Sequence, residues 1–227
     1  MIKVILSFFI YAFMGWSMEV ICKLIETKRF INRGFLLGPI CPIYGYGVLG
    51  IVFLIGQDSK DVLTVFLKSI LICSILEYAT SYFMEKIFHA RWWDYSRRKY
   101  NINGRICLET MIPFGILGTF VIYFLHPLVM RLIGYISPKI QLIIAIFFLV
   151  LYFLDNVLTY FVLNKIKKEI QFENKDNTEI IRERVLLWLN HHSYLYKRIK
   201  DAYPNFQIAL RELKEEIRVK KEKRKSF

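Results

Sequence analysis

Residues 77–109 of the chain read EYATSYFMEKIFHARWWDYSRRKYNINGRICLE, a polar connection with long apolar segments on both sides. Glu77, Ser81 and Glu85 recur every four residues, so on a helix they share one face. The tryptophans and tyrosine that follow suit a lipid-headgroup interface, and the Asn-Gly pair at 103–104 is typical of a tight turn. This pattern predicts a polar hairpin between two membrane helices.

The composition is too apolar for an ordinary soluble domain, because 55% of the 227 residues are hydrophobic and 22% are charged. Four apolar runs meet the roughly 20 residues that a spanning helix needs. The second run, rich in glycine and preceded by proline, fits either a span or a re-entrant helix. The sequence predicts an all-α fold, a polytopic membrane helix bundle of five transmembrane helices in residues 1–164, from runs at about 3–22, 40–56, 62–85, 106–133 and 138–164.

Lysine and arginine are distributed unevenly over the connections between these runs. Residues 23–39 hold four and residues 86–105 hold six, whereas residues 57–61 hold one and residues 131–139 hold two. Because loops rich in lysine and arginine stay on the cytoplasmic side, we expect a multi-pass protein of the cell membrane with its N-terminus outside and residues 165–227 inside. Most of the +13 net charge then follows from topology, and we expect no nucleic-acid partner.

The segment 165–227 differs in character, with 17 lysines and arginines and two apolar stripes at helical spacing on either side of Pro204. It is predicted to be a basic, cytoplasmic tail of amphipathic helices, lying on anionic lipid or beneath the bundle. His191 and His192 have no partner at metal-ligand spacing, and the four cysteines form no CxxC pair. We expect no metal site, no cofactor and four buried, unpaired thiols.

Two segments resemble known motifs, a dinucleotide-binding loop and a signal peptide, but their neighbouring residues do not fit those motifs. Residues 45–50, GYGVLG, match the glycine pattern of dinucleotide-binding loops, but they lie in an apolar run without a preceding strand, where glycines allow helices to approach closely. There is no P-loop sequence for ATP hydrolysis. Residues 1–16 resemble the apolar part of a signal peptide, but the site after them suits cleavage poorly, so we expect an uncleaved first helix.

A weak internal similarity recurs at an offset of 71 residues, which matches Asn32 with Asn103, Leu37 with Leu108, Pro42 with Pro113 and Gly47 with Gly118. A parallel two-helix repeat would place two equivalent polar loops on one side of the membrane, and chance matching of common membrane residues is the alternative.

Acidic residues from four of the predicted helices fall at or near the cytoplasmic half of the membrane. An ionised carboxylate costs about 2.5–3.5 kcal/mol near the bilayer centre and somewhat less nearer the interface. Such a residue is therefore kept either for pairing with arginine or for a function. Arg105 and Glu109 also have the spacing of a local helical pair, and Pro113 and Gly115 allow a kink. The candidate polar site comprises Glu19, Arg33, Glu77, Ser81, Glu85, Arg97, Arg98, Asn103, Arg105, Glu109 and Asp155. We expect Glu19, Glu77, Glu85 and Asp155 to surround one water-accessible cavity, with arginines within pairing distance.

Two long segments, RGFLLGPICPIYGYG at 33–47 and RWWDYSRRKYNINGRICL at 91–108, resemble the ABC-transporter type IV (CmpB-like) membrane protein family. The resemblance covers about residues 10–160 and implies an integral membrane protein of permease type. A permease driven by ATP would need a separate ATPase subunit, docking on the basic loops 23–39 and 86–105, because the chain has no P-loop of its own. The resemblance carries over no catalytic residue.

The leading hypothesis is a permease-like subunit with a polar, cytoplasm-facing intramembrane site. One alternative is an intramembrane enzyme that acts on a lipid or prenyl-like substrate, with Glu77 or Glu85 as general base, although no recognised catalytic motif is present and we lean against an enzyme. Another is a structural or regulatory membrane subunit whose charges serve packing. The expected partners are membrane lipids, the ATPase subunit and, as an open alternative, a second copy of the chain.

Overall fold

The computed structural model describes residues 1–56, 61–88 and 93–173, which form a bundle of helices with one small β-hairpin. The long helices are α1 (Ile2–Thr27), α3 (Val62–Phe88) and α6 (Pro138–Glu173), and α2 (Pro42–Ile55) is shorter. The fourth span is composite, with α4 (Leu108–Phe120), the π-helical turn η1 (Val121–Leu125) and α5 (His126–Gly134). The hairpin consists of β1 (Asn101–Ile102) and β2 (Ile106–Cys107).

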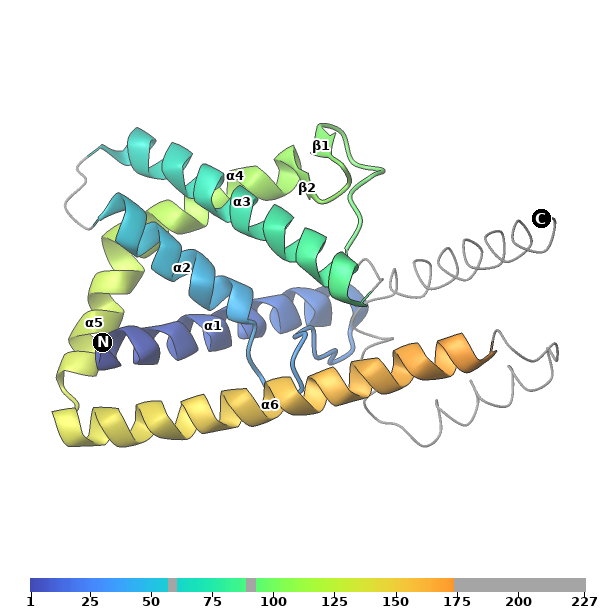
Figure 1. Ribbon diagram of the computed structural model, residues 1–227. Coiled ribbons are helices and arrows are strands. Elements are labelled where there is room, and N and C mark those ends of the chain that lie inside the picture. The colour runs from blue at the N-terminus through green and yellow to red at the C-terminus, as the bar shows by residue number, and fades with distance from the viewer. Residues whose placement is uncertain (57–60, 89–92, 174–227) are drawn as a thin grey trace.

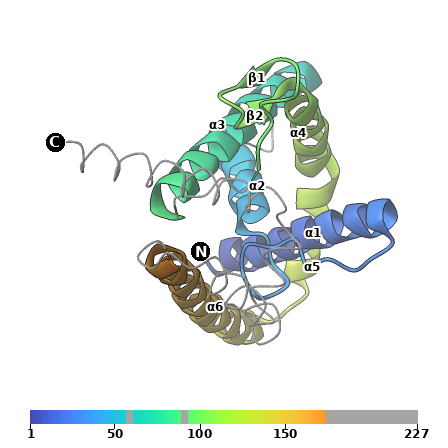
Figure 2. The ribbon, with the colours of Figure 1, turned by 90° about the vertical axis from the view of Figure 1, so that its right-hand side faces the viewer.

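The membrane helices run alternately in opposite directions, so the long connections gather at one end of the bundle (Figure 1). Residues 28–41, residues 93–107 and the C-terminal part of α6 lie at this loop end, while the N-terminus lies at the other. Seen toward the loop end, the hairpin lies beside α3 and the start of α4, on the opposite side of α1 from α6 (Figure 2). The predicted all-α membrane bundle is confirmed.

Four segments are long and apolar enough to cross a membrane: Ile2–Thr27, Val62–Ile87, Leu108–Gly134 and Pro138–Phe161. The helix α2 is the exception, since its 14 residues reach only about 21 Å, less than the roughly 30 Å of a bilayer's hydrocarbon core. The expected five-helix bundle thus consists of four long spans and one short apolar helix. Proline at the start of α2 and Gly56 after its end set its bounds.

The fourth span bends at a place the sequence did not indicate. The helix axis changes direction between α4 and α5, at η1, and not at Pro113 and Gly115 inside α4 (Figure 1). Pro127 explains the position, because it has no N–H for the carbonyl of Tyr123 and its ring would collide with that carbonyl in a regular helix. The wider π-helical turn accommodates the proline.

Glycines of the GYGVLG segment serve helix packing, as the apolar context predicts. A Cβ atom on Gly45 would lie 2.6 Å from Cδ2 of Phe8 in α1, so the two helices touch only because no side chain intervenes. On α4, a Cβ atom on Gly118 would lie 2.3 Å from Oγ of Ser69 in α3. These close approaches hold α2 and α4 against their neighbours.

The hairpin makes the predicted tight turn and adds a pair of short strands to an otherwise helical fold. Its strands pair antiparallel, with Ile102 opposite Ile106. Asn103 and Gly104 both have positive φ, at 53° and 67°, the conformation for which asparagine and glycine are preferred. The Asn101 side chain accepts a hydrogen bond from the Gly104 N–H at 3.0 Å and so fixes the turn from inside.

Two expectations about the ends and the thiols need correction. The helix α6 continues to Glu173, beyond residue 164, where the last apolar run was expected to end, because lysine and glutamate are good helix formers. The cysteines are unpaired, as expected, but only Cys41 and Cys107 are buried, whereas Cys22 is exposed on α1. The histidine pair and the rest of the tail lie outside the described residues.

Candidate functional site

A cavity of about 200 Å³ lies among α1, α2, α3 and α4, beneath the hairpin at the loop end. We call it the polar cavity, because two carboxylates, one guanidinium and two tyrosines are among its lining residues. Much of the remaining wall is apolar, with Ile51, Leu76 and Phe114 among its residues. The polar residues that line it are Glu19, Arg33, Tyr44, Glu77, Trp93 and Tyr95.

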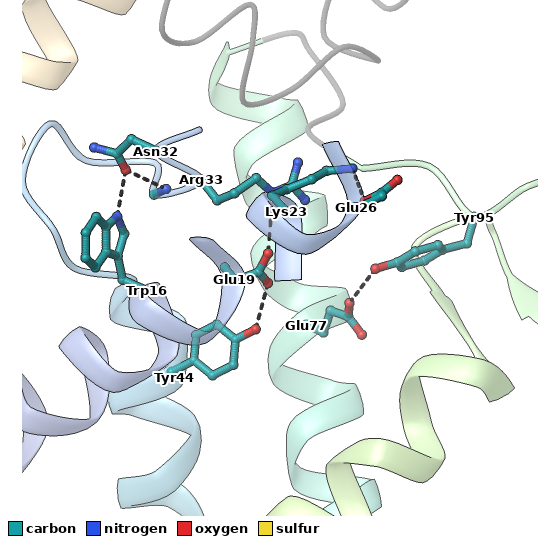
Figure 3. A network of polar contacts seen from close by, with 10 residues as sticks. Trp16, Glu19, Lys23, Glu26, Asn32, Arg33, Tyr44, Glu77 and Tyr95 are labelled. Carbon is teal, nitrogen blue, oxygen red and sulfur yellow. Dashed lines mark hydrogen bonds and ion pairs between the residues drawn. The ribbon is translucent and has the colours of Figure 1, made fainter. Parts of the chain in front are cut away.

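Glu19 of α1 is held by Tyr44 of α2 and by Arg33 of the segment between α1 and α2 (Figure 3). Its Oε1 accepts a hydrogen bond from the Tyr44 hydroxyl at 2.7 Å, and its Oε2 lies 3.4 Å from Nε of Arg33. Gly15, one turn before Glu19, makes room for the tyrosine, because a Cβ atom there would lie 2.2 Å from Cγ of Tyr44. Gly15 and Glu19 together therefore fix the position of Tyr44, the first by leaving room for its ring and the second by accepting its hydroxyl hydrogen bond.

The segment that carries Arg33 is fixed by an asparagine. The Asn32 side-chain oxygen accepts hydrogen bonds from Nε1 of Trp16 at 2.7 Å and from the Gly34 N–H at 3.2 Å (Figure 3). Its amide group donates to the Leu37 carbonyl at 3.4 Å. This network ties the segment to α1 and holds Arg33 above Glu19.

Glu77 of α3 is the most deeply placed acid of the polar cavity, with a relative exposure of 7%. Its Oε1 accepts a hydrogen bond from the Tyr95 hydroxyl at 3.3 Å. Its Oε2 is buried and makes no hydrogen bond of ordinary geometry among the described residues; the Thr110 hydroxyl is near, but it donates to the Cys107 carbonyl at 2.9 Å. A buried carboxylate oxygen without a donor is costly, and this atom therefore distinguishes Glu77 from Glu19.

Tyr95 reaches the cavity from the hairpin segment, where its own N–H donates to the Gly104 carbonyl at 2.7 Å. Burial raises the pKa of Tyr95 far above its usual range, and the nearby Glu77 carboxylate raises it further. The phenol is therefore neutral and acts as the donor toward Glu77. Trp93 also lines the cavity, and its Nε1 donates to the Arg105 carbonyl at 3.0 Å.

Arg105 anchors the hairpin to α3, and it is 9% exposed. Its Nη1 lies 2.7 Å from Oε2 of Glu85 and donates to Oγ of Ser81 at 3.2 Å. Its guanidinium carbon also lies 5.6 Å and 5.5 Å from the ring centroids of Tyr78 and Tyr82. The acidic face of α3 thus divides between Glu77, which faces the cavity, and Ser81 and Glu85, which hold the hairpin.

Arg105 and Glu109 do not form the local pair that their spacing allows. Glu109 instead pairs with Arg98 at 2.9 Å, in an ion pair whose side chains are 58% and 62% exposed. Arg97 is exposed on the same hairpin. Asn103 donates to the Tyr78 hydroxyl at 2.9 Å and so assists Arg105 in attaching the hairpin. Hairpin contacts, and not helical spacing, decide which charges meet.

Asp155 of α6 binds backbone amides and does not line the polar cavity. Its two carboxylate oxygens accept hydrogen bonds from the N–H groups of Leu37 and Gly38, both at 2.8 Å. Gly38 permits this approach, since a Cβ atom there would lie 2.9 Å from Oδ2 of Asp155. Asp155 lines a separate, mainly apolar hollow of about 830 Å³ between α1 and α6.

The structure therefore brings Glu19, Arg33 and Glu77 together in one cavity and separates the other candidate residues from it. Ser81, Glu85, Asn103 and Arg105 attach the hairpin, Arg98 and Glu109 pair at the surface, and Asp155 binds the segment after α1. The sequence analysis did not include Tyr44 among the site residues. Gly15 was the feature of the sequence that could have indicated this contact, because a glycine on a helix leaves room for another side chain to pack against it.

Two ion pairs have a similar arrangement in the two halves of the chain. Glu19 near the end of α1 pairs with Arg33, directly after Asn32, and Glu85 near the end of α3 pairs with Arg105, two residues after Asn103. The two acids are 66 residues apart (85 − 19) and the two arginines 72 (105 − 33), so neither follows the offset of 71 residues. The repeat stays a prediction.

Comparison with known proteins gives one relationship. No curated protein and no solved structure matches the chain. A family model described as Putative ABC-transporter type IV matches residues 6–160, which is more than half of the chain and includes every residue of the polar cavity. Together with the four apolar spans, this match indicates a multi-pass membrane protein. The chain belongs to the Putative ABC-transporter type IV family.

Proposed function

We propose that the chain is a permease-like membrane subunit and that the polar cavity is its substrate site. The observation that supports this most directly is Glu77, whose buried Oε2 has no hydrogen-bond partner among the described residues. Acidic groups at membrane depth are costly and are usually retained for a ligand, a proton or a partner charge. Glu77 lines the polar cavity, and a turn of its carboxyl group would bring this buried oxygen to a ligand that supplies the missing donor.

The hairpin is the part of the proposed site that closes it toward the loop end. Trp93 and Tyr95 line the cavity from above, and Arg105 holds the hairpin on α3. A substrate entering from the loop end passes this hairpin, so the ion pair of Arg105 with Glu85 controls how readily the site opens. Membrane lipids surround the spans, and the hollow between α1 and α6 has the apolar lining that suits their chains.

The proposal is tested with inside-out vesicles from cells that produce the protein, its Glu77→Gln variant or a Glu26→Gln control. Glu26 is an exposed acid of α1 that pairs with Lys23, so the control removes one carboxylate outside the cavity. Vesicles are incubated with a cell extract, and retained solutes are measured by mass spectrometry. We expect at least one solute to accumulate with the wild type and the control but not with Glu77→Gln. Identical solute contents in all three would refute the permease role.

The ATPase partner and the orientation are part of the same proposal. The described parts of the basic segments 23–39 and 86–105 belong to the loop end, which we place on the cytoplasmic side, where an ATPase subunit docks. Protein purified in a mild detergent should then carry ATPase activity, and ATP should stimulate uptake into the vesicles. If neither is found, the dependence on an ATPase is wrong.

Orientation is tested by labelling single cysteines at the two ends of the bundle. Tyr135→Cys lies in the exposed turn between α5 and α6, and Lys99→Cys lies in the exposed hairpin. A membrane-impermeant maleimide should modify position 135 on intact cells and position 99 only after the membrane is opened. The reverse pattern would place the loop end outside.

An enzyme acting on lipid is the competing function, and the same variants separate it from transport. Lipid extracts of cells with the wild type, Glu77→Gln or Glu26→Gln are compared by mass spectrometry. We expect the three lipid profiles to agree. A lipid species that changes only with Glu77→Gln would favour catalysis in the cavity over transport.

A further inference from the structure

We propose that the polar cavity binds a small protonated amine with an apolar body, its ammonium group against Glu77. The inference rests on the proposed function for its physiological role, but the binding itself is tested separately. Charge is the first argument. Glu19 and Glu77 bring two carboxylates into the cavity lining, whereas Arg33 is the one arginine or lysine among the described lining residues. A ligand with one positive charge balances this set, and an anion would add to the excess of negative charge.

Hydrogen bonding decides which kind of cation fits. Both oxygens of Glu19 are engaged, by Tyr44 and Arg33, and Oε1 of Glu77 accepts from Tyr95. Oε2 of Glu77 is buried and has no donor among the described residues, so a ligand in the cavity reaches it once the carboxyl group turns toward the cavity. A primary ammonium group supplies N–H donors to that oxygen, whereas a quaternary ammonium has none. No cluster of three or more potential metal ligands occurs in the described part of the chain, so a protonated amine fits this arrangement better than a metal ion.

The walls of the cavity indicate the rest of the ligand. The rings of Tyr44, Trp93 and Tyr95 line it, and aromatic faces attract ammonium groups. Much of the remaining wall is aliphatic or phenyl, including Ile51 and Leu117. Because an apolar cavity of about 150 Å³ holds benzene, the roughly 200 Å³ available here suits a body of about that size with an aminomethyl group. Benzylamine therefore represents the class.

The test uses the full-length protein in detergent and three probes that share one ring and differ in charge: benzylamine, benzyl alcohol and benzoate. Binding is measured by isothermal titration calorimetry, with empty micelles as the blank. We expect saturable binding of benzylamine to the wild type, weaker binding of benzyl alcohol and none of benzoate. Glu77→Gln should weaken benzylamine binding about tenfold or more, because it removes a charged hydrogen-bond acceptor, whereas Glu26→Gln should leave it unchanged.

Several outcomes would overturn the inference. They are benzoate binding as tightly as benzylamine, equal benzylamine affinity in the wild type and Glu77→Gln, or no saturable binding of benzylamine. Melting curves establish that the variant is folded, and the comparison of three probes on the wild type decides the matter even where it is not. Vesicle uptake separates this inference from the proposed function. Benzylamine binding without solute accumulation retains the ligand class and refutes the permease, while accumulation of solutes without benzylamine binding does the reverse.

Discussion

The attachment of the hairpin to α3 should be measurable as a coupling energy between Arg105 and Glu85. Arg105→Met keeps the length of the side chain but removes its charge. The ion pair with the partly exposed Glu85 contributes about 1.5 kcal/mol, the Ser81 hydrogen bond about 1 kcal/mol and the two tyrosine faces about 0.5 kcal/mol. The variant should therefore lose about 3 kcal/mol of the free energy of unfolding.

Glu85→Gln alone should cost about 1.5 kcal/mol, and the double variant should cost little more than Arg105→Met, which gives a coupling energy of about 1.5 kcal/mol. The matched control is the pair Arg98–Glu109 on the same hairpin, whose side chains are mostly exposed. Its cycle, with Arg98→Met and Glu109→Gln, should give a coupling below about 0.5 kcal/mol.

Both cycles are measured by SDS titration of the purified protein in mixed micelles. The reasoning would be refuted if the two pairs coupled equally, because burial of Arg105 is the property that separates them. Uptake by the double variant carries a second result. Normal transport in the double variant would mean that this ion pair serves packing, while altered transport would support its role in opening the cavity.

Three further predictions use other contacts, measured by the same titration. Asp155→Asn should cost about 1.5 kcal/mol and Asp155→Ala about 3 kcal/mol, because one or both carboxylate oxygens that accept from the backbone N–H groups are lost; no effect would contradict the contact. Gly15→Ala should cost about 1–3 kcal/mol by displacing Tyr44, whereas Gly134→Ala, with open space around it, should be nearly neutral, and equal effects would exclude this packing. A neighbouring threonine hydroxyl lowers the pKa of Asp61, which therefore stabilises the fold above about pH 4 and stops doing so as pH falls. Asp61→Asn should flatten the loss of stability between about pH 6 and pH 3, and an unchanged slope would contradict it.

Features that depend on local sequence were predictable. The apolar runs predicted the spans, because a helix that crosses a bilayer must be long and hydrophobic. The Asn-Gly pair predicted the turn, because few residues other than asparagine and glycine adopt positive φ. The glycines of residues 45–50 were correctly assigned to packing, since their surroundings excluded a nucleotide loop.

Contacts between distant segments were not predictable in the same way. Spacing along one helix favoured Glu109 as the partner of Arg105, but the hairpin turns Arg105 toward α3 instead. Asp155 was expected to join the other acids, yet its partners outside α6 are backbone amides, which every residue except proline carries and no sequence pattern marks. The bend of the fourth span depends on Pro127, whose effect falls on a carbonyl four residues earlier.

The bond between Asp155 and the backbone at Leu37 and Gly38 has a mechanical consequence. It joins the middle of α6 to the segment that carries Arg33, four residues before Leu37, and Arg33 in turn holds Glu19. A lateral shift of α6 is therefore transmitted through a short, hydrogen-bonded linkage to one wall of the polar cavity. A movement of α6 at the loop end would therefore change the shape of the polar cavity, although none of the described residues of α6 lines that cavity.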